Sequence, residues 1–582
     1  MSKIVRLWFL LLLSPLFTSC FNLDEELYDR IEKENYYTDY TSLMAALLRP
    51  YAPAQLSTQV YTFWLQELAA DQLVNTQKSE HWQDGGKWRM LHQHTWDPYE
   101  ENCQQLWNAC YGGIGYCNNV LADISTLDYA AFGLSEELRT QHIAELKTLR
   151  AYYQLQLFDL FHTPPISTSN YKEVGNASPK ENFRFIEESL KEALPALPKA
   201  PCKQYEGRLT QGAAATLLMR LYFNASWYID EPMWRETRAV CEQLLQGAYG
   251  TYALATDWTQ IWNVGNGDCP ALIWSYPQSK QFTYAEFYYL NFMHYTAPEQ
   301  FGCGTDLPDG YNGCHLTPSY DPAGHPYQTA LGCPFAKFAE NDCRKRNFQV
   351  TAPGEYEGLF LFGPQYSYAE NTLLVGTEEW GGQPLCFVDQ VAHYSYVLTE
   401  AERRQLIERQ LAGSHPWRIE EERFASLSSN VTTGEENSGV RLVKYPIYPS
   451  DDAAFMANDF VVLRLSEVYY TLAECCFRLG EVAEAEHWLN QVRQRYFSAE
   501  DWAEARYPET GAQLTEQELL DEWGREFLGE SRRRTDLNRF DRLTKGSWWD
   551  KQPSESYRRF YPIPAQAIRA NPLLERSVGY TY

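Results

Sequence analysis

Helical periodicity recurs at both ends of the chain. Apolar residues return every three or four positions over 41–49 and 142–161, the spacing that places them on one face of a helix. The same spacing marks five further segments: 179–194, 210–229, 233–246, 461–479 and 481–496. The pattern therefore predicts a mostly α-helical protein in which several helices follow one another as pairs.

The ends of the predicted helices carry their own signals. Pro164 and Pro165 follow 142–161 and cannot continue that helix. Ser178 and Pro179 form an N-cap and first-turn pair that opens the next helix. Gly480 separates the last two predicted helices, where we expect it to act as a C-cap glycine.

The last helix pair resembles a tetratricopeptide unit. Small residues at Ala473, Gly480 and Ala485 would let two helices approach closely, while larger residues fill the next layer. One such unit is a weak signal. Several helix pairs spread along the chain nevertheless favour a tetratricopeptide-like helical-repeat scaffold.

The pattern changes in the middle of the chain. Gly, Pro, Tyr and Asn become dense over 251–460, and regular helical spacing is hard to find there. Long irregular segments are usually functional or disordered, and the aromatic content of this one argues against disorder. We therefore expect a long, aromatic-rich insertion of ordered loops and short strands.

The first 20 residues read as a secretory signal. Lys3 and Arg6 introduce a short apolar run over 7–13, and small polar residues precede Cys20. This arrangement predicts that 1–19 are removed and that Cys20 receives acyl chains such as palmitate, which would tether the mature protein to a membrane. The alternative is an ordinary cleaved signal with a coincidental cysteine.

Composition and charge narrow the class of ligand. Aromatic residues make up 15% of the chain, with 41 Tyr and 18 Trp, side chains that favour sites with one apolar and one wet side. The net charge of −26 repels nucleic acid and anionic surfaces at long range. Nucleic-acid binding is therefore not expected, and a neutral or cationic ligand fits better than a phosphorylated one.

Two segments combine aromatic rings with amide and charged side chains, a mixture that suits sugars because rings stack on their apolar faces and polar groups bind their hydroxyls. The first offers Trp82, Trp88 and Trp96, together with Asn75, Asp84 and Arg89. The second offers Tyr311, Asn312, Tyr366, Tyr368 and Trp380. Trp82 and Trp380 are the first choices, although core packing explains any single ring equally well.

Motifs for common catalytic centres are missing from the sequence, including HExxH, GxSxG and Gly-rich phosphate loops. A glycosidase needs only two carboxylates at a set separation, so 76 Asp and Glu leave that alternative open. The chain is nevertheless interpreted as a binding protein rather than an enzyme.

Metal ligands at a recognised spacing are missing as well. Cys103, Cys110 and Cys117 recur every seven residues and are expected to be buried thiols on one helix face. His92 and His94 are expected to be a surface pair rather than half of a metal site. No cofactor and no metal are expected.

Short motifs in both halves match one family in their order and spacing. The first half supplies Trp107, Tyr111, Ile114, 118–121, 149–153 and 207–214. The second half supplies 463–469, 472–474, 489–493, 526–527, Arg534, 536–537, 539–540, 561–564 and 571–572. On these residues the chain is similar to the SusD/RagB family of nutrient-binding outer-membrane lipoproteins.

The resemblance implies a SusD-like fold and a protein that binds oligosaccharide for a SusC-type, TonB-dependent transporter. It implies a lipid anchor on the outer membrane, and acidic Asp24, Glu25 and Glu26 resemble a surface-export signal. The expected organisation is a signal peptide, an N-terminal helical region, a ligand-binding insertion and a C-terminal helical region, at 1–19, 20–250, 251–460 and 461–582. The alternatives are a RagB-like peptide binder, a surface glycosidase and a helical-repeat adaptor.

Several charged residues inside these motifs resemble an acid–base constellation. They are Arg150, Arg464, Glu474, Arg493, Glu526, Arg534 and Asp536. On amphipathic helices such residues more often form partly buried ion pairs that fix packing, and this is the favoured interpretation.

Overall fold

The computed structural model describes the chain in stretches. These are residues 36–78, 81–199, 205, 207–279, 286–295, 310–319, 327–346, 348–352, 355–362, 379–380, 383–384, 430–434, 439–446 and 457–582. The chain divides into a small unit, 1–47, and a large unit, 48–582. Most of helix α3 (Tyr40–Leu48) belongs to the small unit, and it confirms the helix expected over 41–49.

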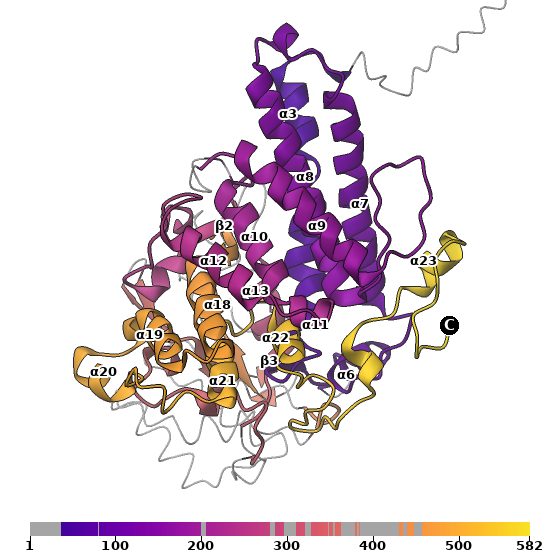
Figure 1. The fold of residues 1–582 in the computed structure, drawn as a ribbon. Helices are drawn as coiled ribbons and strands as arrows, with labels where there is room; N and C mark the ends of the chain where they lie inside the picture. The colour runs from indigo at the N-terminus through magenta and orange to yellow at the C-terminus, as the bar shows by residue number, and fades with distance from the viewer. Residues whose placement is uncertain are drawn as a thin grey trace, which may run out of the picture. The chain divides into compact units, whose positions relative to one another are not determined.

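Helices dominate the first half of the large unit (Figure 1). They are α4 (Tyr51–Leu56), the π-helical turn η2 (Ser57–Thr62), α5 (Phe63–Glu67), α6 (Lys87–His92), α7 (Glu101–Ile124), α8 (Glu136–Phe161) and α9 (Pro179–Ala193). α7 packs on α4, η2 and α8, and α8 packs on α9. Successive helices are therefore neighbours in space, as in a stack of helix pairs.

The stack continues into helices from the far end of the chain. It takes in α10 (Gln211–Phe223), α11 (Ala225–Tyr228), α12 (Trp234–Leu245), α18 (Leu465–Arg478) and α19 (Val482–Arg493). α9 contacts α10, α10 contacts α12, α12 contacts α18, and α18 contacts α19. In Figure 1 the magenta α12 accordingly lies beside the orange α18, although more than two hundred residues separate them. The prediction of a mostly helical protein is confirmed.

Shorter helices complete the described chain. They are α13 (Glu286–Phe292), α20 (Ala499–Ala505), α21 (Glu516–Glu526), α22 (Arg533–Arg539) and α23 (Ala565–Ala570). Short 3₁₀ turns are η3 (Asp84–Gly86), η4 (Tyr129–Phe132), η5 (Leu194–Ala196), η7 (Trp258–Ile261), η8 (Asn266–Asp268), η10 (Phe335–Lys337), η11 (Cys343–Lys345), η12 (Gln494–Tyr496) and η13 (Ser556–Arg559). α22 packs on α5 and α11, which joins the two ends of the large unit.

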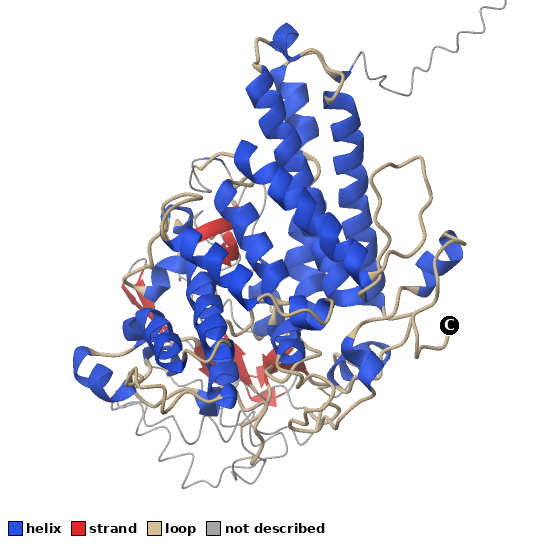
Figure 2. Cartoon of the chain, in the orientation of Figure 1, coloured by secondary structure: helices blue, strands red, loops and turns tan. Residues whose placement is uncertain are grey.

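Strands in the described residues form two-stranded antiparallel pairs rather than one large sheet (Figure 2). The pairs are β1 (Leu73–Asn75) with β3 (Cys314–Leu316), β2 (Leu272–Tyr276) with β10 (Phe460–Arg464), β4 (Gln349–Ala352) with β5 (Glu355–Glu357), β6 (Phe360–Phe362) with β9 (Val440–Leu442), and β7 (Glu379–Trp380) with β8 (Gln383–Pro384). The pairs β1–β3, β2–β10 and β6–β9 join segments that are distant in the sequence, whereas β4–β5 and β7–β8 are local hairpins.

One predicted helix begins too early. The segment 461–479 was expected to be helical throughout, but 460–464 form β10 and α18 starts at Leu465. Val461 and Leu463 pair with Ser275 and Trp274 of β2. β-Branched side chains favour this extended conformation, and the partner strand satisfies the backbone groups that a helix would have paired.

The predicted helix ends are confirmed. The Ser178 hydroxyl accepts from the Glu181 N–H at 3.3 Å, and the Glu181 carboxylate accepts from the Ser178 N–H at 2.7 Å, which makes a capping box. After α18, Gly480 has φ +86°, and the N–H of Glu481 donates to the Cys476 carbonyl at 2.8 Å. This bond and the left-handed glycine form a Schellman C-cap.

The charged motif residues form buried ion pairs, as expected. Glu526 accepts from Arg464 at 2.6 Å and from Arg495 at 2.8 Å, and its other oxygen lies 3.3 Å from Arg344. Glu474 accepts from Arg539 at 2.9 and 3.0 Å. Arg150 departs from the pattern, because it donates to the amide oxygen of Asn118 at 2.9 Å. These contacts fix helix packing.

Two further properties follow from the helices. Cys103, Cys110 and Cys117 are buried on one face of α7, so the prediction of packed thiols is confirmed. Within the described stretches, no helix combines the length and the apolar character that crossing a bilayer would require.

Candidate ligand-binding site

A surface pocket of about 200 Å³ opens where the end of β1, the loop before α6, α6 itself and the loop 430–434 meet. Its lining consists of Asn75, Gln77, Trp82, Gln83, Gly85, Gly86, Arg89, Val431 and Thr432. Three of these, Asn75, Trp82 and Arg89, belong to the first candidate segment identified from the sequence. We call this depression the Trp82 pocket.

Strand pairing explains why the two candidate segments meet beside this pocket. Asn75 ends β1 and lies opposite Cys314, the first residue of β3, so the residues just before β3 are brought to the same place. The Trp82 indole N–H donates to the Tyr311 carbonyl at 2.8 Å. Gly313 lies directly against the Trp82 ring, where any Cβ would overlap the indole. The Trp82 ring is thereby held against the backbone of the second segment, beside the exposed Tyr311.

The backbone beside the pocket is unusually strained. Trp82, Asp84, Gly85 and Gly86 all have left-handed φ values, at 59°, 39°, 64° and 86°. For Trp and Asp this conformation is uncommon, because Cβ crowds the backbone. Such strain persists where surrounding contacts impose it, and it clusters at binding sites. Here Trp82, Gly85 and Gly86 are themselves part of the pocket lining.

Asn75 supplies an unsatisfied polar group to the pocket. Its side chain is 1% exposed, and within the described part of the chain neither its amide oxygen nor its amide nitrogen has a hydrogen-bond partner. An unpaired buried amide costs roughly 1–3 kcal/mol, which a ligand hydroxyl could recover by bonding to it. Arg89, exposed on α6, adds a guanidinium at the rim.

Trp88 does not offer its ring to a ligand. It is buried, its indole N–H donates to Asp84 at 2.6 Å, and its ring packs on Trp64 at 4.9 Å. Trp88 also lies behind Trp82, with ring centroids 5.7 Å apart. Its expected role as a contact residue is therefore corrected to support of the Trp82 ring.

Trp96 and Asn312 are corrected in the same way. Trp96 is fully buried, where it contacts Tyr561 at 4.5 Å and donates to the Tyr580 hydroxyl at 2.9 Å. Asn312 is 2% exposed, and its amide oxygen accepts from Arg441 at 2.5 Å. Tryptophan and asparagine both suit sugar binding, but here the Trp96 indole and the Asn312 amide oxygen already contact partners inside the protein.

Three expected sites lie outside the described residues. Cys20 and Tyr366 fall in undescribed stretches, and so does Tyr368. Trp380 belongs to β7, but its side chain is not described. Their roles remain predictions.

Sequence reasoning missed the far wall of the pocket. Val431 and Thr432 line it, although nothing in their local sequence marks them as ligand residues. The loop is held by backbone bonds to Gln77, whose N–H donates to the Val431 carbonyl at 2.8 Å and whose carbonyl accepts from Gly434 at 2.9 Å. This long-range pairing helps to bring Thr432 into the same pocket lining as Trp82 and Arg89.

The expected surface pair of histidines is wrong. His92, the last residue of α6, and His94, in the turn that follows, are both buried. His94 contacts the Ser554 hydroxyl at 3.0 Å and the Ala69 carbonyl at 2.8 Å, and burial lowers its pKa. His92 contacts Asp550 at 2.5 Å. Each ring therefore has its own structural partners.

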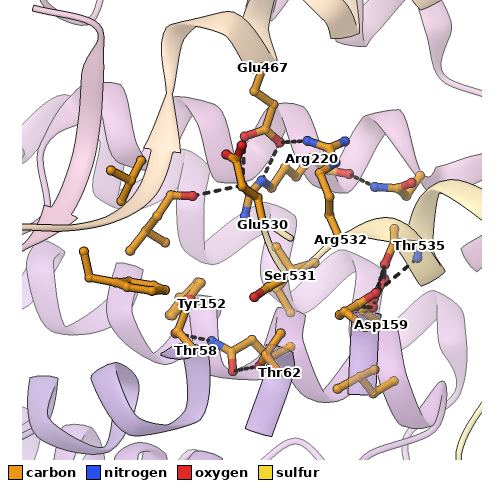
Figure 3. A pocket seen from close by; sticks show the side chains of 18 of the residues that line it. Thr58, Thr62, Tyr152, Asp159, Arg220, Glu467, Glu530, Ser531, Arg532 and Thr535 are labelled. Carbon is orange, nitrogen blue, oxygen red and sulfur yellow. Dashed lines mark hydrogen bonds and ion pairs between the residues drawn. The ribbon is translucent and has the colours of Figure 1, made fainter. Parts of the chain in front are cut away.

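A second cavity, of about 110 Å³, lies among the helices and is shown in Figure 3. Arg220 donates to Glu467 at 2.6 and 2.8 Å, and Arg532 also lies 3.1 Å from Glu467. Across the cavity, Asp159 accepts from Thr535. Because Arg220 and Arg532 both pair with Glu467, and Asp159 pairs with Thr535, we interpret the cavity as a gap between packed helices rather than as a ligand site.

A third depression, of about 310 Å³, lies between α7 and α23. Its aromatic residue Trp107 is buried, and the Tyr111 hydroxyl already donates to the Pro165 carbonyl at 2.7 Å. The Trp82 pocket alone among these three combines a half-exposed ring with an unpaired buried amide. It is therefore the candidate ligand site.

Comparisons with known proteins match two regions of this chain to family models. Residues 415–580 match the SusD family model, and residues 23–223 match a model described as starch-binding and associating with outer membrane. The starch-binding protein SusD of Bacteroides thetaiotaomicron is 36% identical over 155 residues, which span 24% of this chain and only 26% of SusD. A SusD-like protein of Formosa agariphila is 21% identical over 81% of this chain and 78% of its own length.

Solved structures share the fold. NanU of Bacteroides fragilis has a TM-score of 0.65 at 16% identity, covering 94% of this chain and 98% of NanU. Surface glycan-binding protein A of Bacteroides thetaiotaomicron, solved with laminarihexaose, has a TM-score of 0.62 at 16% identity, covering 93% of this chain and all of that one. With residues 23–223 and 415–580 both matched by models of this family, the chain belongs to the SusD/RagB family.

Proposed function

We propose that this protein binds an oligosaccharide in the Trp82 pocket at the cell surface and passes it on without cleaving it. The observation that carries the proposal is the pairing of a half-exposed indole with the unpaired, buried amide of Asn75 in one pocket. An aromatic face and a buried hydrogen-bonding group that lacks a partner are what a sugar ring and its hydroxyls would complete. The printed names of the relatives, starch-binding and glycan-binding, support the same class of ligand.

The chemistry of the pocket supports binding rather than hydrolysis. Glycoside hydrolysis uses two carboxyl groups that flank the bond to be broken. None of the pocket-lining residues that the structure describes is Asp or Glu. Polar contacts there come from the amides of Asn75, Gln77 and Gln83, the guanidinium of Arg89 and the hydroxyl of Thr432.

The partners follow from the family rather than from the pocket. We infer that acyl chains on Cys20 anchor the protein to the outer membrane with its ligand site facing outward. From there it would deliver the oligosaccharide to a SusC-type, TonB-dependent transporter. An anchored binder raises the local concentration of ligand at its transporter, which is the physical benefit of tethering.

Glycan capture by the full-length protein tests the proposal. We expect the wild type to bind at least one class of oligosaccharide on a glycan array, and Trp82→Ala to lower the affinity by roughly 10- to 30-fold in calorimetry, because a buried aromatic anchor contributes about 2 kcal/mol. Trp502→Ala is the matched control, since Trp502 is also half-buried but lies on α20 outside the pocket lining.

Three outcomes would contradict the proposal. Equal losses of glycan affinity in the Trp82 and Trp502 variants would show that the pocket does not bind the glycan. Capture of cationic peptides but of no glycan would favour a RagB-like peptide binder. Shortened products from a bound glycan would show hydrolysis.

A further inference from the structure

Asp550 lies outside the lining of the Trp82 pocket but contacts two of its walls. One carboxylate oxygen is 2.5 Å from His92 Nε2, and the other accepts from the Val431 N–H at 2.8 Å. His92 ends α6, the helix that carries Arg89, and Val431 belongs to the loop 430–434. One side chain therefore joins walls that come from distant parts of the sequence.

The carboxylate is charged and accepts both bonds. Burial opposes ionisation of Asp550, but the hydrogen bond from His92 and the backbone N–H of Val431 outweigh it and lower the pKa of Asp550. Because an ionised carboxylate has only acceptor atoms, His92 must donate from Nε2. A charge-assisted bond of this kind is stronger and more directional than one between neutral groups.

The turn that carries Asp550 is held in place by hydrogen bonds and buried side chains. It lies in a turn that the N–H of Lys551 closes by donating to the Trp548 carbonyl at 2.7 Å. Trp548 is fully buried, and the Lys551 ammonium donates to the Leu543 carbonyl at 2.8 Å. On the other side, the Trp549 ring packs on the His92 ring at 5.4 Å. These contacts hold the turn in place, so the Asp550 carboxylate can fix the positions of α6 and the loop 430–434.

We propose that Asp550 is a positioning residue for the glycan site, holding α6 and the loop 430–434 at the separation at which Arg89 and Thr432 reach the same ligand. The inference rests on the proposed function of the Trp82 pocket. Backbone bonds from Gln77 fasten the loop to the end of β1, and Asp550 bonds it to α6 as well. Without that bond, the ligand would have to fix the separation between the two walls as it binds.

The experiment compares affinities for whichever oligosaccharide the wild type binds, measured by calorimetry on full-length variants. Asp550→Ala releases both walls and is expected to weaken binding roughly tenfold, the cost of ordering one or two side chains. Asp550→Asn should restore most of the affinity, because its amide oxygen accepts from Val431 and its amide nitrogen donates to His92 Nε2 once the neutral imidazole carries its proton on Nδ1. His92→Ala should have the smaller effect, since the Val431 bond remains.

The matched control is Asp521→Ala. Asp521 bonds Lys337 at 2.6 Å, and its side chain is 13% exposed, against 14% for Asp550, but it does not contact the pocket lining. Its loss should lower thermal stability while leaving glycan affinity unchanged. If Asp550→Ala fails to fold, the comparison moves to His92→Ala against His92→Gln, whose amide can still donate to Asp550; recovery of affinity by Gln is expected.

The results separate this inference from the function on which it rests. The positioning role would be overturned if Asp550→Ala bound glycan as tightly as the wild type. It would also be overturned if the Asp550→Ala and Asp521→Ala variants lost glycan affinity equally, or if Asp550→Asn recovered none of it. If Trp82→Ala loses glycan binding in the same series, the pocket remains the binding site even though Asp550 does not position it. A wild type that binds no glycan would instead overturn the proposed function.

Discussion

Asn75 and Gln66 show, at the scale of single residues, how a ligand group differs from a packing group. The Gln66 amide donates to Asp159 at 2.6 Å, and its oxygen accepts from the Thr535 N–H at 3.1 Å. Asn75 is as deeply buried, yet neither end of its amide has a partner within the described chain. A protein that keeps such a group gives up stability at that position, which is the usual mark of a functional site.

Asn75→Leu should therefore raise stability and lower glycan affinity. Leucine has nearly the same shape but no polar atoms to leave unpaired, so we expect the free energy of unfolding to rise by about 1 kcal/mol. The glycan loses a buried hydrogen-bonding partner, so its affinity should fall by roughly tenfold. Urea unfolding and calorimetry measure the two effects. A variant that is less stable, or that binds glycan as well as the wild type, would show that the amide serves packing.

The three tryptophans of the first candidate segment show that residue type alone does not decide which side chain is exposed. Trp82, Trp88 and Trp96 lie within 15 positions and look alike in sequence, yet Trp82 alone of the three is left half-exposed. Trp96 is enclosed by the C-terminal segment, which supplies Tyr561 and Tyr580. Since those partners are more than 450 positions away, no local pattern could have separated the three rings.

At the scale of elements, the contact between α7 and α8 depends on one glycine. Gly113 lies on the face of α7 toward α8, and a Cβ there would overlap the Tyr153 ring. The Tyr153 hydroxyl donates to the Pro50 carbonyl, so the ring is held in place. Gly112, one position earlier, faces solvent with no atom near its missing Cβ.

The two glycines make a matched pair for mutation. Gly113→Ala should destabilise the protein by roughly 1–3 kcal/mol, because overpacking a held ring outweighs the gain in helix propensity. Gly112→Ala should stabilise it by up to about 1 kcal/mol, since only propensity changes. Chemical denaturation of both variants checks the sign. Two changes in the same direction would contradict the close approach of α7 and α8.

At the scale of the whole molecule, buried charge joins the helices of the C-terminal region to the strands and loops of the middle. Burial opposes ionisation of Glu526, but Arg464, Arg495 and Arg344 outweigh it and lower its pKa from an ordinary 4.5 to about 2. The pKa values of Asp71 and Glu522 are likewise lowered to about 2. Each depressed pKa stabilises the fold above pH 4.5, and this stabilisation is lost as pH falls toward 2.

Glu526→Gln tests this account through pH. Near neutral pH the variant should lose roughly 3 kcal/mol, because three buried guanidinium groups lose the charge that compensates them. As pH falls from 4.5 toward 2 the wild-type carboxylate is itself protonated, so the difference between the two proteins should shrink. Urea unfolding near pH 7 and near pH 3 measures both values. A difference that stays constant with pH would contradict the ion-pair account.

The sequence by itself determined the helices, their caps and the family. Periodicity, the Ser178 capping box and the Gly480 C-cap are properties of contiguous residues, so they can be read before any fold is known. It also singled out Asn75, Trp82 and Arg89, because their side-chain chemistry is visible in one short segment.

Only the tertiary structure decided which rings are exposed, that 461–464 form a strand, and which residues make the pocket. Pairing of β1 with β3 places Trp82 against Tyr311, and Asp550 places Val431 beside α6. Burial and pairing of this kind depend on partners hundreds of positions away, and such contacts leave no periodic signal in either partner's own sequence.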